Sequence, residues 1–242
     1  DCYRAIDMIK DRLLANGVVM ALPIGAEEHF AGVVDLVTMK ATVYDSEKGE
    51  HFVEKEIPAD MLEKAKQYRD KVIEAAAEYD DEVMHKYMEG KEVSNEEIMR
   101  GIRKGTVANK LVPMTCGTAF KNKGVQPLLD LVIALLPSPL DKPAIKGVNP
   151  KTGAEEERKS SDTEPFSALG FKIMSDPFVG KLTYFRIYSG KLTCGSYAYN
   201  STKNKQERIG RLLQMHANHR EEIDEAYAGD IVAAVGIKTV TT

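Results

Sequence analysis

The stretch Lys110-Leu-Val-Pro-Met-Thr-Cys-Gly-Thr-Ala-Phe-Lys-Asn-Lys-Gly-Val-Gln126 decides the fold class of this chain. Its apolar start, 110–116, predicts a short strand, and the residues 117–124 predict a loop. From Val125 to Leu136 apolar side chains recur at helical spacing. The prolines at 137 and 139 end that helix, because proline lacks the N–H that a helix needs. A strand, a glycine-bearing loop and a helix form the unit on which α/β proteins place ligands.

The residues before this stretch predict further helices and a small sheet. Residues 3–14 place apolar side chains on one helical stripe. Short β-branched runs between 18 and 44 predict strands. One long helix is expected from 62 to 88, and a second begins at Ser94, which forms an S-x-x-E capping box with Glu97.

The residues after this stretch follow a different pattern. Residues 141–164 are rich in Lys, Pro, Gly and Ser and predict a linker with an exposed turn. After Pro165, short apolar runs separated by glycines predict a small antiparallel barrel. The expected fold class is therefore α/β followed by all-β.

Length and composition limit the classes of protein that fit. A chain of 242 residues with 43% hydrophobic content suits two globular units. No apolar run approaches the length of a membrane span, and the first residues lack the pattern of a secretory signal. The three cysteines are far apart and lack C-x-x-C spacing, which favours a reducing cytosol and predicts no zinc site.

Charge is distributed unevenly along the chain. Glu47 to Glu97 holds 16 acidic residues against 8 basic ones, and Lys181 to Arg220 holds 8 basic residues against one glutamate. The first segment suits a basic protein surface and the second suits phosphates. Ordinary solvated faces are the alternative interpretation of both segments.

Seven segments of the chain also carry a family resemblance. They are Leu22-Pro-Ile-Gly-Ala-Glu, Gly32-Val-Val-Asp-Leu, Thr115-Cys-Gly-Thr-Ala-Phe-Lys-Asn-Lys-Gly-Val-Gln, Leu136-Pro-Ser-Pro, Asp176-Pro-Phe-Val-Gly-Lys-Leu, Arg186-Ile-Tyr-Ser-Gly and Gln214-Met-His-Ala-Asn. In this order and spacing the chain resembles elongation factor G, the bacterial ribosomal translocase, over essentially all 242 residues.

The resemblance implies a division into domains. Residues 1–139 would be the C-terminal part of a P-loop GTPase domain, with an inserted α+β subdomain at about 17–109. Residues 140–242 would be the following translation-factor-type β-barrel, domain II of the translocase, without its last strands. The resemblance thus implies an incomplete GTPase domain followed by most of a barrel.

The chain lacks the motifs that handle phosphates in a GTPase. There is no G-x-x-x-x-G-K-[ST] loop and no Asn-Lys-x-Asp motif, and the switch regions are also absent. The parent protein would be a GTPase that uses GTP or GDP with Mg²⁺. No catalytic residue is predicted in this segment, which alone is expected to be inactive and to hold no nucleotide.

One nucleotide element remains, the loop at Gly117, Thr118 and Ala119. In the family, backbone N–H groups of this loop approach the O6 acceptor of guanine, a position where adenine carries an amino donor. Thr118 stands where serine is commoner in the family. Without the resemblance, the same residues would be interpreted as an ordinary turn between a strand and a helix.

Two charged surfaces resemble docking faces of the family. The acidic residues Glu74, Glu78, Asp81 and Glu82 resemble the face that receives the ribosomal stalk protein. The basic residues Lys203, Lys205, Arg208 and Arg211 suit the ribosomal RNA backbone. Few aromatic residues lie among the basic ones, so contacts to phosphates are expected rather than contacts to bases.

Other candidate sites are assigned to structure. His216 and His219 lack a set of further ligands at metal spacing, so an exposed pair is expected and no metal site is predicted. Cys116 adjoins the loop but has no base partner in the sequence, and it is interpreted as a small buried hydrophobic residue.

The implied function of the parent is GTP-driven movement of tRNA and mRNA through the ribosome in the cytoplasm. Its partners would be ribosomal RNA, the stalk protein and the tRNA–mRNA complex, with neither membrane nor DNA. A tetracycline-type ribosomal protection protein or another paralogous translational GTPase is an alternative. A further alternative is that the segment acts only as a ribosome-docking module.

Overall fold

The computed structural model describes residues 2–150, 152–217, 219–237 and 239–241. The chain divides into two compact units, residues 1–137 and 138–242. The division falls inside the Pro137-Ser138-Pro139 stretch, just before the boundary expected after residue 139. Asp1 and Thr242, the outer limits of the predicted domains, lie outside the described residues.

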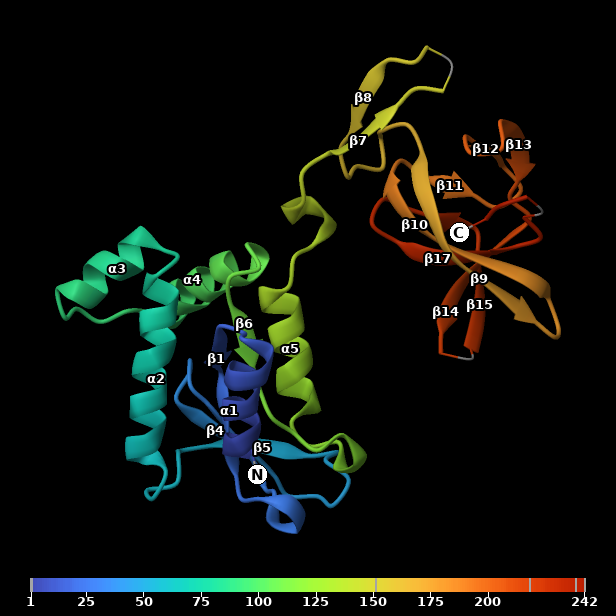
Figure 1. The fold of residues 1–242 in the computed structure, drawn as a ribbon. Helices are drawn as coiled ribbons and strands as arrows, with labels where there is room; N and C mark the ends of the chain where they lie inside the picture. The colour runs from blue at the N-terminus through green and yellow to red at the C-terminus, as the bar shows by residue number, and fades with distance from the viewer. Residues whose placement is uncertain (1, 151, 218, 238, 242) are drawn as a thin grey trace. The chain divides into compact units, whose positions relative to one another are not determined.

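The first unit contains two sheets. The larger is an antiparallel meander in the order β2-β3-β4-β5, and the smaller pairs β1 with β6 in parallel (Figure 1). The strands are β1 Gly17–Val19, β2 Ala21–Ile24, β3 Gly32–Asp35, β4 Lys40–Tyr44, β5 Phe52–Lys55 and β6 Val112–Met114. β1 and β6 are far apart in the sequence, since the meander and three α-helices lie between them, and their pairing brings the two segments together.

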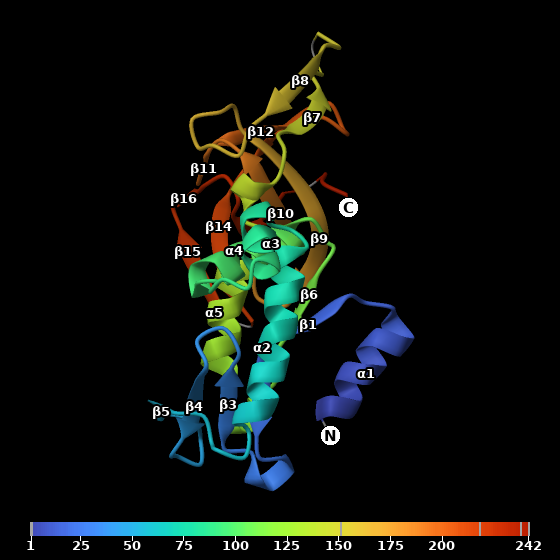
Figure 2. The same ribbon diagram turned by 90° about the vertical axis from the view of Figure 1, so that its left-hand side faces the viewer.

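The described residues of the first unit also form five α-helices (Figure 2). They are α1 Cys2–Leu13, α2 Leu62–Ala77, α3 Asp81–Met88, α4 Asn95–Val107 and α5 Val125–Leu135, and the 3₁₀ turns are η1 Glu27–His29 and η2 Ala119–Lys121. The capping box predicted at Ser94 is present, since its hydroxyl accepts from Glu97 N and the Glu97 carboxylate accepts from Ser94 N.

The single helix predicted from 62 to 88 is wrong, because α2 and α3 are separate helices (Figure 1). The break lies at Asp80, which has extended backbone angles and accepts hydrogen bonds from Glu82 N and Val83 N. Asp80 is therefore the N-cap of a new helix. The Asp80 carboxylate accepts hydrogen bonds from the N–H groups of Glu82 and Val83, which in a continuous helix would donate to backbone carbonyls of the preceding turn.

The core of the first unit lies between the strands and two helices. Fully buried side chains come from β2 and β3, from α2 and from α4; examples are Leu22, Val34, Val72, Ile98 and Ile102. α2 and α4 approach closely at Gly101, where an added Cβ would lie 2.5 Å from Ala76 O. Glycine permits this approach because it has no side chain.

The second unit is built from antiparallel strands, as expected for the residues after Pro165. Its largest sheet has the order β15-β14-β17-β10-β9, and every strand pair described in the unit is antiparallel. The elements are η3 Pro139–Asp141, β7 Ile145–Val148, β8 Glu155–Arg158, β9 Ser167–Asp176, β10 Gly180–Ser189, β11 Leu192–Thr193, β12 Tyr197–Asn200, β13 Lys205–Arg208, β14 Arg211–His216, β15 His219–Ile223, β16 Glu225–Ala226 and β17 Ile231–Val235.

Local signals explain the turns of this unit. Asp176 ends β9, and its carboxylate accepts from Phe178 N at 2.8 Å and from Val179 N at 3.0 Å. Gly180 then adopts a φ of +78°, which only glycine adopts readily. The side chains of Phe185, Ile187 and Leu212 are buried in the main core of the unit. The arrangement is barrel-like and agrees with the expected all-β class.

Candidate functional site

The loop predicted to contact guanine follows β6 and precedes α5. Thr118 and Lys123 close it with two backbone hydrogen bonds, Thr118 N to Lys123 O at 2.8 Å and Lys123 N to Thr118 O at 3.2 Å. η2 lies between them, and Asn122 has a left-handed backbone with a φ of +56°. The loop is therefore a short closed hairpin that leads into the helix.

Two glycines allow this loop to close. An added Cβ at Gly117 would lie 2.8 Å from Lys123 O, and one at Gly124 would lie 2.9 Å from Cys116 O. Gly124 also has a φ of +83°, where a side chain would be strained. Side chains at these positions would push the two arms of the loop apart.

The backbone amides of the loop differ in availability. The Thr118 N–H is used inside the loop by Lys123 O. Among the residues that the structure describes, no acceptor is recorded for the Ala119 N–H, which opens the 3₁₀ turn. Of the three predicted residues, Thr118 uses its N–H inside the loop, whereas no acceptor is recorded among the described residues for the N–H of Gly117 or of Ala119.

The turn between β4 and β5 supports this loop, a contact that the sequence did not predict. Gly49 has a φ of +64°, and an added Cβ there would lie 2.5 Å from Asn122 O and 2.7 Å from Lys121 O. Close by, the Tyr44 hydroxyl donates to Gln126 Oε1 at 2.9 Å. The inserted meander thus contacts both the loop and the first turn of α5.

Replacing Gly49 with alanine is expected to destabilise the first unit and to loosen the loop. The left-handed backbone alone costs about 1 kcal/mol for a residue with a Cβ, and displacement of the loop adds about 1–3 kcal/mol. Gly90→Ala is the matched control, because Gly90 has a φ of +67° and nothing within 4 Å of an added Cβ. The free energy of unfolding and the hydrogen exchange of the Thr118 and Lys123 amides measure the effect. Equal losses in the two variants would contradict this contact.

Cys116 is held between the loop and the meander. It packs against a small cluster formed by Ala21, Phe30 and Val33, with its Sγ 3.9 Å from Ala21 O. Burial raises the pKa of the Cys116 thiol, and the neighbouring Cys2 raises it further. The raised pKa keeps the thiol neutral at ordinary pH. Cys116 packs against apolar residues as predicted, but it is partly buried rather than buried.

The acidic residues predicted to form one helical stripe lie on two elements. Glu74 belongs to α2, Glu78 is its C-cap, and Asp81 and Glu82 form the first turn of α3. All four side chains are exposed, but Glu82 is paired with Arg100 at 2.6 Å. The stripe on a single helix is therefore wrong, and the four residues form an exposed acidic group around the α2–α3 junction.

The same junction contains an ionic cluster that the sequence analysis missed. The Asp80 carboxylate accepts from Arg100 Nε and from Lys104 Nζ, each at 2.7 Å. These charge-assisted bonds to the two cations hold the pKa of Asp80 well below its usual range. An aspartate followed by Glu82 and the apolar Val83 is an N-cap pattern, and this signal would have found the helix start.

The basic residues predicted to contact ribosomal RNA lie on one hairpin and the strand after it. Lys203 is in the β12–β13 turn, Lys205 and Arg208 begin and end β13, and Arg211 begins β14. All four are exposed, and Arg211 is paired with Glu222 at 3.0 Å.

Tyrosines on the partner strand accompany these cations. Tyr197 lies directly opposite Arg208 in the β12–β13 register, and Tyr199 lies opposite Gln206. Both rings are largely exposed. The expectation that aromatic side chains are scarce around the basic residues came from the sequence of β13 alone, and the cross-strand neighbours alter it.

His216 and His219 face each other across the β14–β15 pair, and both are exposed. Asn218, the last residue of the Gln214–Asn218 segment, lies outside the described residues. In the described part of the chain, no cluster of three or more His, Cys, Asp or Glu residues suits a metal ion. No helix among these residues has the length and apolar content needed to cross a bilayer.

Comparisons with known proteins agree with this architecture. Residues 165–242 match the family model of elongation factor G domain 2. A crystal structure of a protein from Thermus thermophilus matches 97% of this chain with a TM-score of 0.75 and 26% sequence identity. The chain spans 32% of the length of that protein. These findings show that residues 165–242 are similar to domain 2 of elongation factor G, and that the fold of nearly the whole chain is similar to that of the Thermus thermophilus protein.

Proposed function

We propose that this chain is a segment of a bacterial elongation factor G, the GTPase that drives tRNA and mRNA movement through the ribosome. The match of residues 165–242 to domain 2 of that factor carries the proposal. In this assignment residues 140–242 are domain II, and residues 1–139 are the end of the GTPase domain with its insertion at about 17–109. The factor works in the cytoplasm with ribosomal RNA, the stalk protein and the tRNA–mRNA complex.

The open apolar faces of the first unit support the assignment of an incomplete α/β domain. β1 and β6 form a parallel sheet of only two strands, whereas parallel sheets in α/β proteins are covered on both faces. α5 exposes a row of apolar side chains, among which Ile133 is 80% exposed. α1 packs Tyr3 and Ile6 against the core but has no buried residue, and its Leu13 is 71% exposed. Further strands and helices of a GTPase domain would cover these surfaces.

The loop at Gly117, Thr118 and Ala119 is the proposed contact to guanine. The Ala119 N–H has the chemistry to donate to the O6 acceptor of guanine, which adenine does not offer. The glycines on either side keep the backbone open to a close approach. GTP and Mg²⁺ would supply the hydrolysable phosphate and its counter-charge, and the phosphate-binding motifs would come from elsewhere in the parent protein.

The chain itself is expected to bind neither GDP nor GTP in the presence of Mg²⁺. In P-loop GTPases, contacts to the phosphates and Mg²⁺ contribute most of the nucleotide-binding energy, and the guanine loop alone does not supply them. Calorimetric titration beside an intact elongation factor G measures this. Micromolar binding by the chain would contradict the assignment of the missing motifs, and Ala119 variants would then locate the site.

For the segment alone, docking on the ribosome is the activity that we propose. The exposed basic group Lys203, Lys205, Arg208 and Arg211 supports RNA contact. The exposed acidic group Glu74, Glu78, Asp81 and Glu82 supports contact with the stalk protein, where opposite charge accelerates encounter. Sedimentation of the chain with bacterial ribosomes over a range of salt concentrations tests the proposal. Absence of binding at low salt would overturn it.

A further inference from the structure

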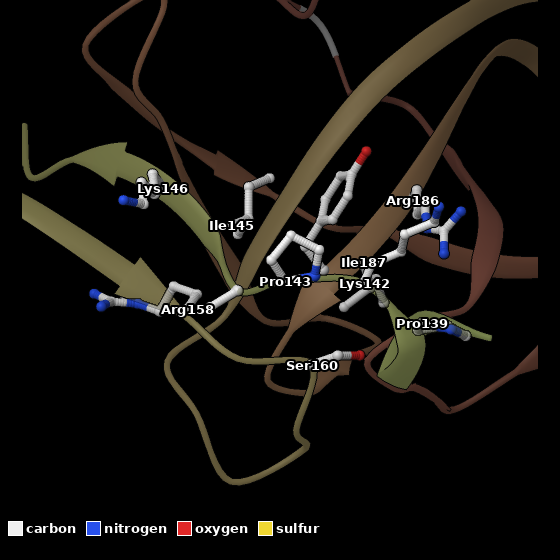
Figure 3. A pocket seen from close by; sticks show the side chains of 11 residues that line it. Pro139, Lys142, Pro143, Ile145, Lys146, Arg158, Ser160, Arg186 and Ile187 are labelled. Carbon is white, nitrogen blue, oxygen red and sulfur yellow. The ribbon is translucent and has the colours of Figure 1, made fainter. Parts of the chain in front are cut away.

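A cavity in the second unit combines an apolar centre with basic borders. It has a volume of about 420 Å³ and lies between the segment after η3, the β7–β8 hairpin and β10 (Figure 3). Its charged lining residues are Lys142, Lys146, Arg158 and Arg186, and no acidic residue in the described part of the chain lines it. Its charge therefore suits an anionic ligand.

The cations lie on opposite sides of this cavity. Figure 3 shows Lys146 and Arg158 on one side and Arg186 on the other, with Pro143 and Ile145 between them. Cations that lie apart in this way do not converge on one small anion. They suit a chain of anions that crosses an apolar floor.

The cations on the two sides of the cavity differ in whether a carboxylate of the chain already pairs with them. Lys146 is paired with Glu157 at 3.3 Å, and Arg158 is paired with Glu156. Among the described residues, Lys142 and Arg186 have no carboxylate partner. The charge that no carboxylate balances therefore comes mainly from Lys142 and Arg186, and the Arg186 guanidinium also lies over the Tyr188 ring, 5.6 Å from its centroid.

Aromatic rings extend this site along the unit. Tyr188 lines the cavity, and a second cavity of about 490 Å³ shares Tyr188, Ile145 and Arg158 with it. The second cavity reaches Tyr199, whose hydroxyl donates to Asn204 Oδ1 at 3.1 Å between Lys203 and Lys205. The two cavities thus form one groove, here called the tyrosine groove, which ends at the basic hairpin.

We propose that the tyrosine groove binds single-stranded RNA, with bases stacked on Tyr188 and Tyr199 and phosphates beside the flanking cations. The inference rests on the proposed function, which brings this unit to ribosomal RNA. Unpaired bases offer the faces that aromatic rings stack on, whereas bases in a duplex are already stacked. Cations border the apolar lining of the first cavity, and Glu156, the acidic residue that lines the second cavity, is paired with Arg158.

Fluorescence anisotropy with a labelled oligouridylate of about 12 nucleotides tests this proposal. The K142A/R186A variant is expected to bind about tenfold more weakly and to lower the slope of log K against log salt by about 1.4, since two phosphate contacts are lost. Y188L is expected to bind about 5- to 100-fold more weakly, and Y188F is expected to bind like wild type. K66A/K172A removes the same charge at exposed positions that do not line the groove.

Three outcomes would overturn the proposal. They are no oligonucleotide binding by wild type at low salt, equal affinities for K142A/R186A and K66A/K172A, and equal loss in Y188L and Y188F. A duplex of the same length that binds as well, and whose affinity Y188L leaves unchanged, would likewise exclude base stacking. If the chain binds ribosomes but the groove does not bind the oligonucleotide, this inference alone is contradicted. If the groove binds the oligonucleotide but the chain does not bind ribosomes, the proposed function alone is contradicted.

Discussion

Replacement of Asp80 by alanine is expected to lower the free energy of unfolding of the first unit by about 3 kcal/mol. The Asp80 side chain is 2% exposed and binds Arg100 and Lys104, each at 2.7 Å. It also caps α3, a contribution of about 1 kcal/mol. The side chains of Arg100 and Lys104 are 42% and 54% exposed, so water can replace part of their interaction with Asp80. The loss of stability is therefore expected near the low end of the range for a broken buried ion pair.

The loss is measured by urea unfolding followed through hydrogen exchange in α3 and α4. Asp81→Asn is the control, because Asp81 also opens α3 but is exposed and makes no recorded ion pair among the described residues. It is expected to cost no more than about 1 kcal/mol, through the helix dipole. Equal decreases in the free energy of unfolding for the Asp80 and Asp81 variants would show that the buried ion pairs of Asp80 do not stabilise the unit.

Asp80 also predicts how stability depends on pH. Its pKa is lowered in the folded protein, so its contribution is fully present above the unfolded value near 4 and is lost as pH falls towards the folded value. The difference in free energy of unfolding between wild type and Asp80→Asn should therefore shrink as the pH falls below about 4. A difference that stays constant down to strongly acidic pH would contradict the ionic role of Asp80.

Removal of the basic group on the β13 hairpin is expected to weaken ribosome binding on the order of 100-fold at low salt. The variant carries alanine at Lys203, Lys205, Arg208 and Arg211. Each cation that neutralises an RNA phosphate releases a counterion, so the slope of log K against log salt should fall by about 3. Glu222 already pairs with Arg211, and that residue is expected to contribute least.

The control for this variant removes four exposed lysines from the first unit, Lys55, Lys66, Lys71 and Lys91. It changes the net charge equally but leaves the β13 hairpin intact. Sedimentation with ribosomes distinguishes the two variants. Equal weakening would mean that net charge alone governs binding, and the hairpin would then lose its proposed role.

Periodicity in the sequence predicted most of the local structure. The apolar repeat at 125–136 predicted α5, and Ser94 with Glu97 predicted the start of α4. The prediction of one long helix was wrong, although apolar residues continue at helical spacing on both sides of Asp80. The helix breaks there because the buried Asp80 carboxylate caps a new helix. Its partners Arg100 and Lys104 lie on another helix, and helical spacing within one segment does not show them.

The surroundings of the candidate sites depend on contacts between segments that are far apart in the sequence. Gly49 supports the loop at 117–124 only because the meander folds back against it. The tyrosines of β12 join the basic residues of β13 only through the strand register. Sequence motifs indicated the loop and the charges, whereas packing determines which amide is available and which rings lie beside the cations.

Competition with an intact elongation factor G on the ribosome tests the proposed function most directly. We expect an excess of this chain to slow the GTP hydrolysis that ribosomes stimulate in the intact factor, because both would dock on the same surfaces. The variant without the basic group should not compete. GTP hydrolysis that is unaffected when the chain is bound to the ribosomes would contradict the proposal, because it would place the chain at a site that elongation factor G does not use.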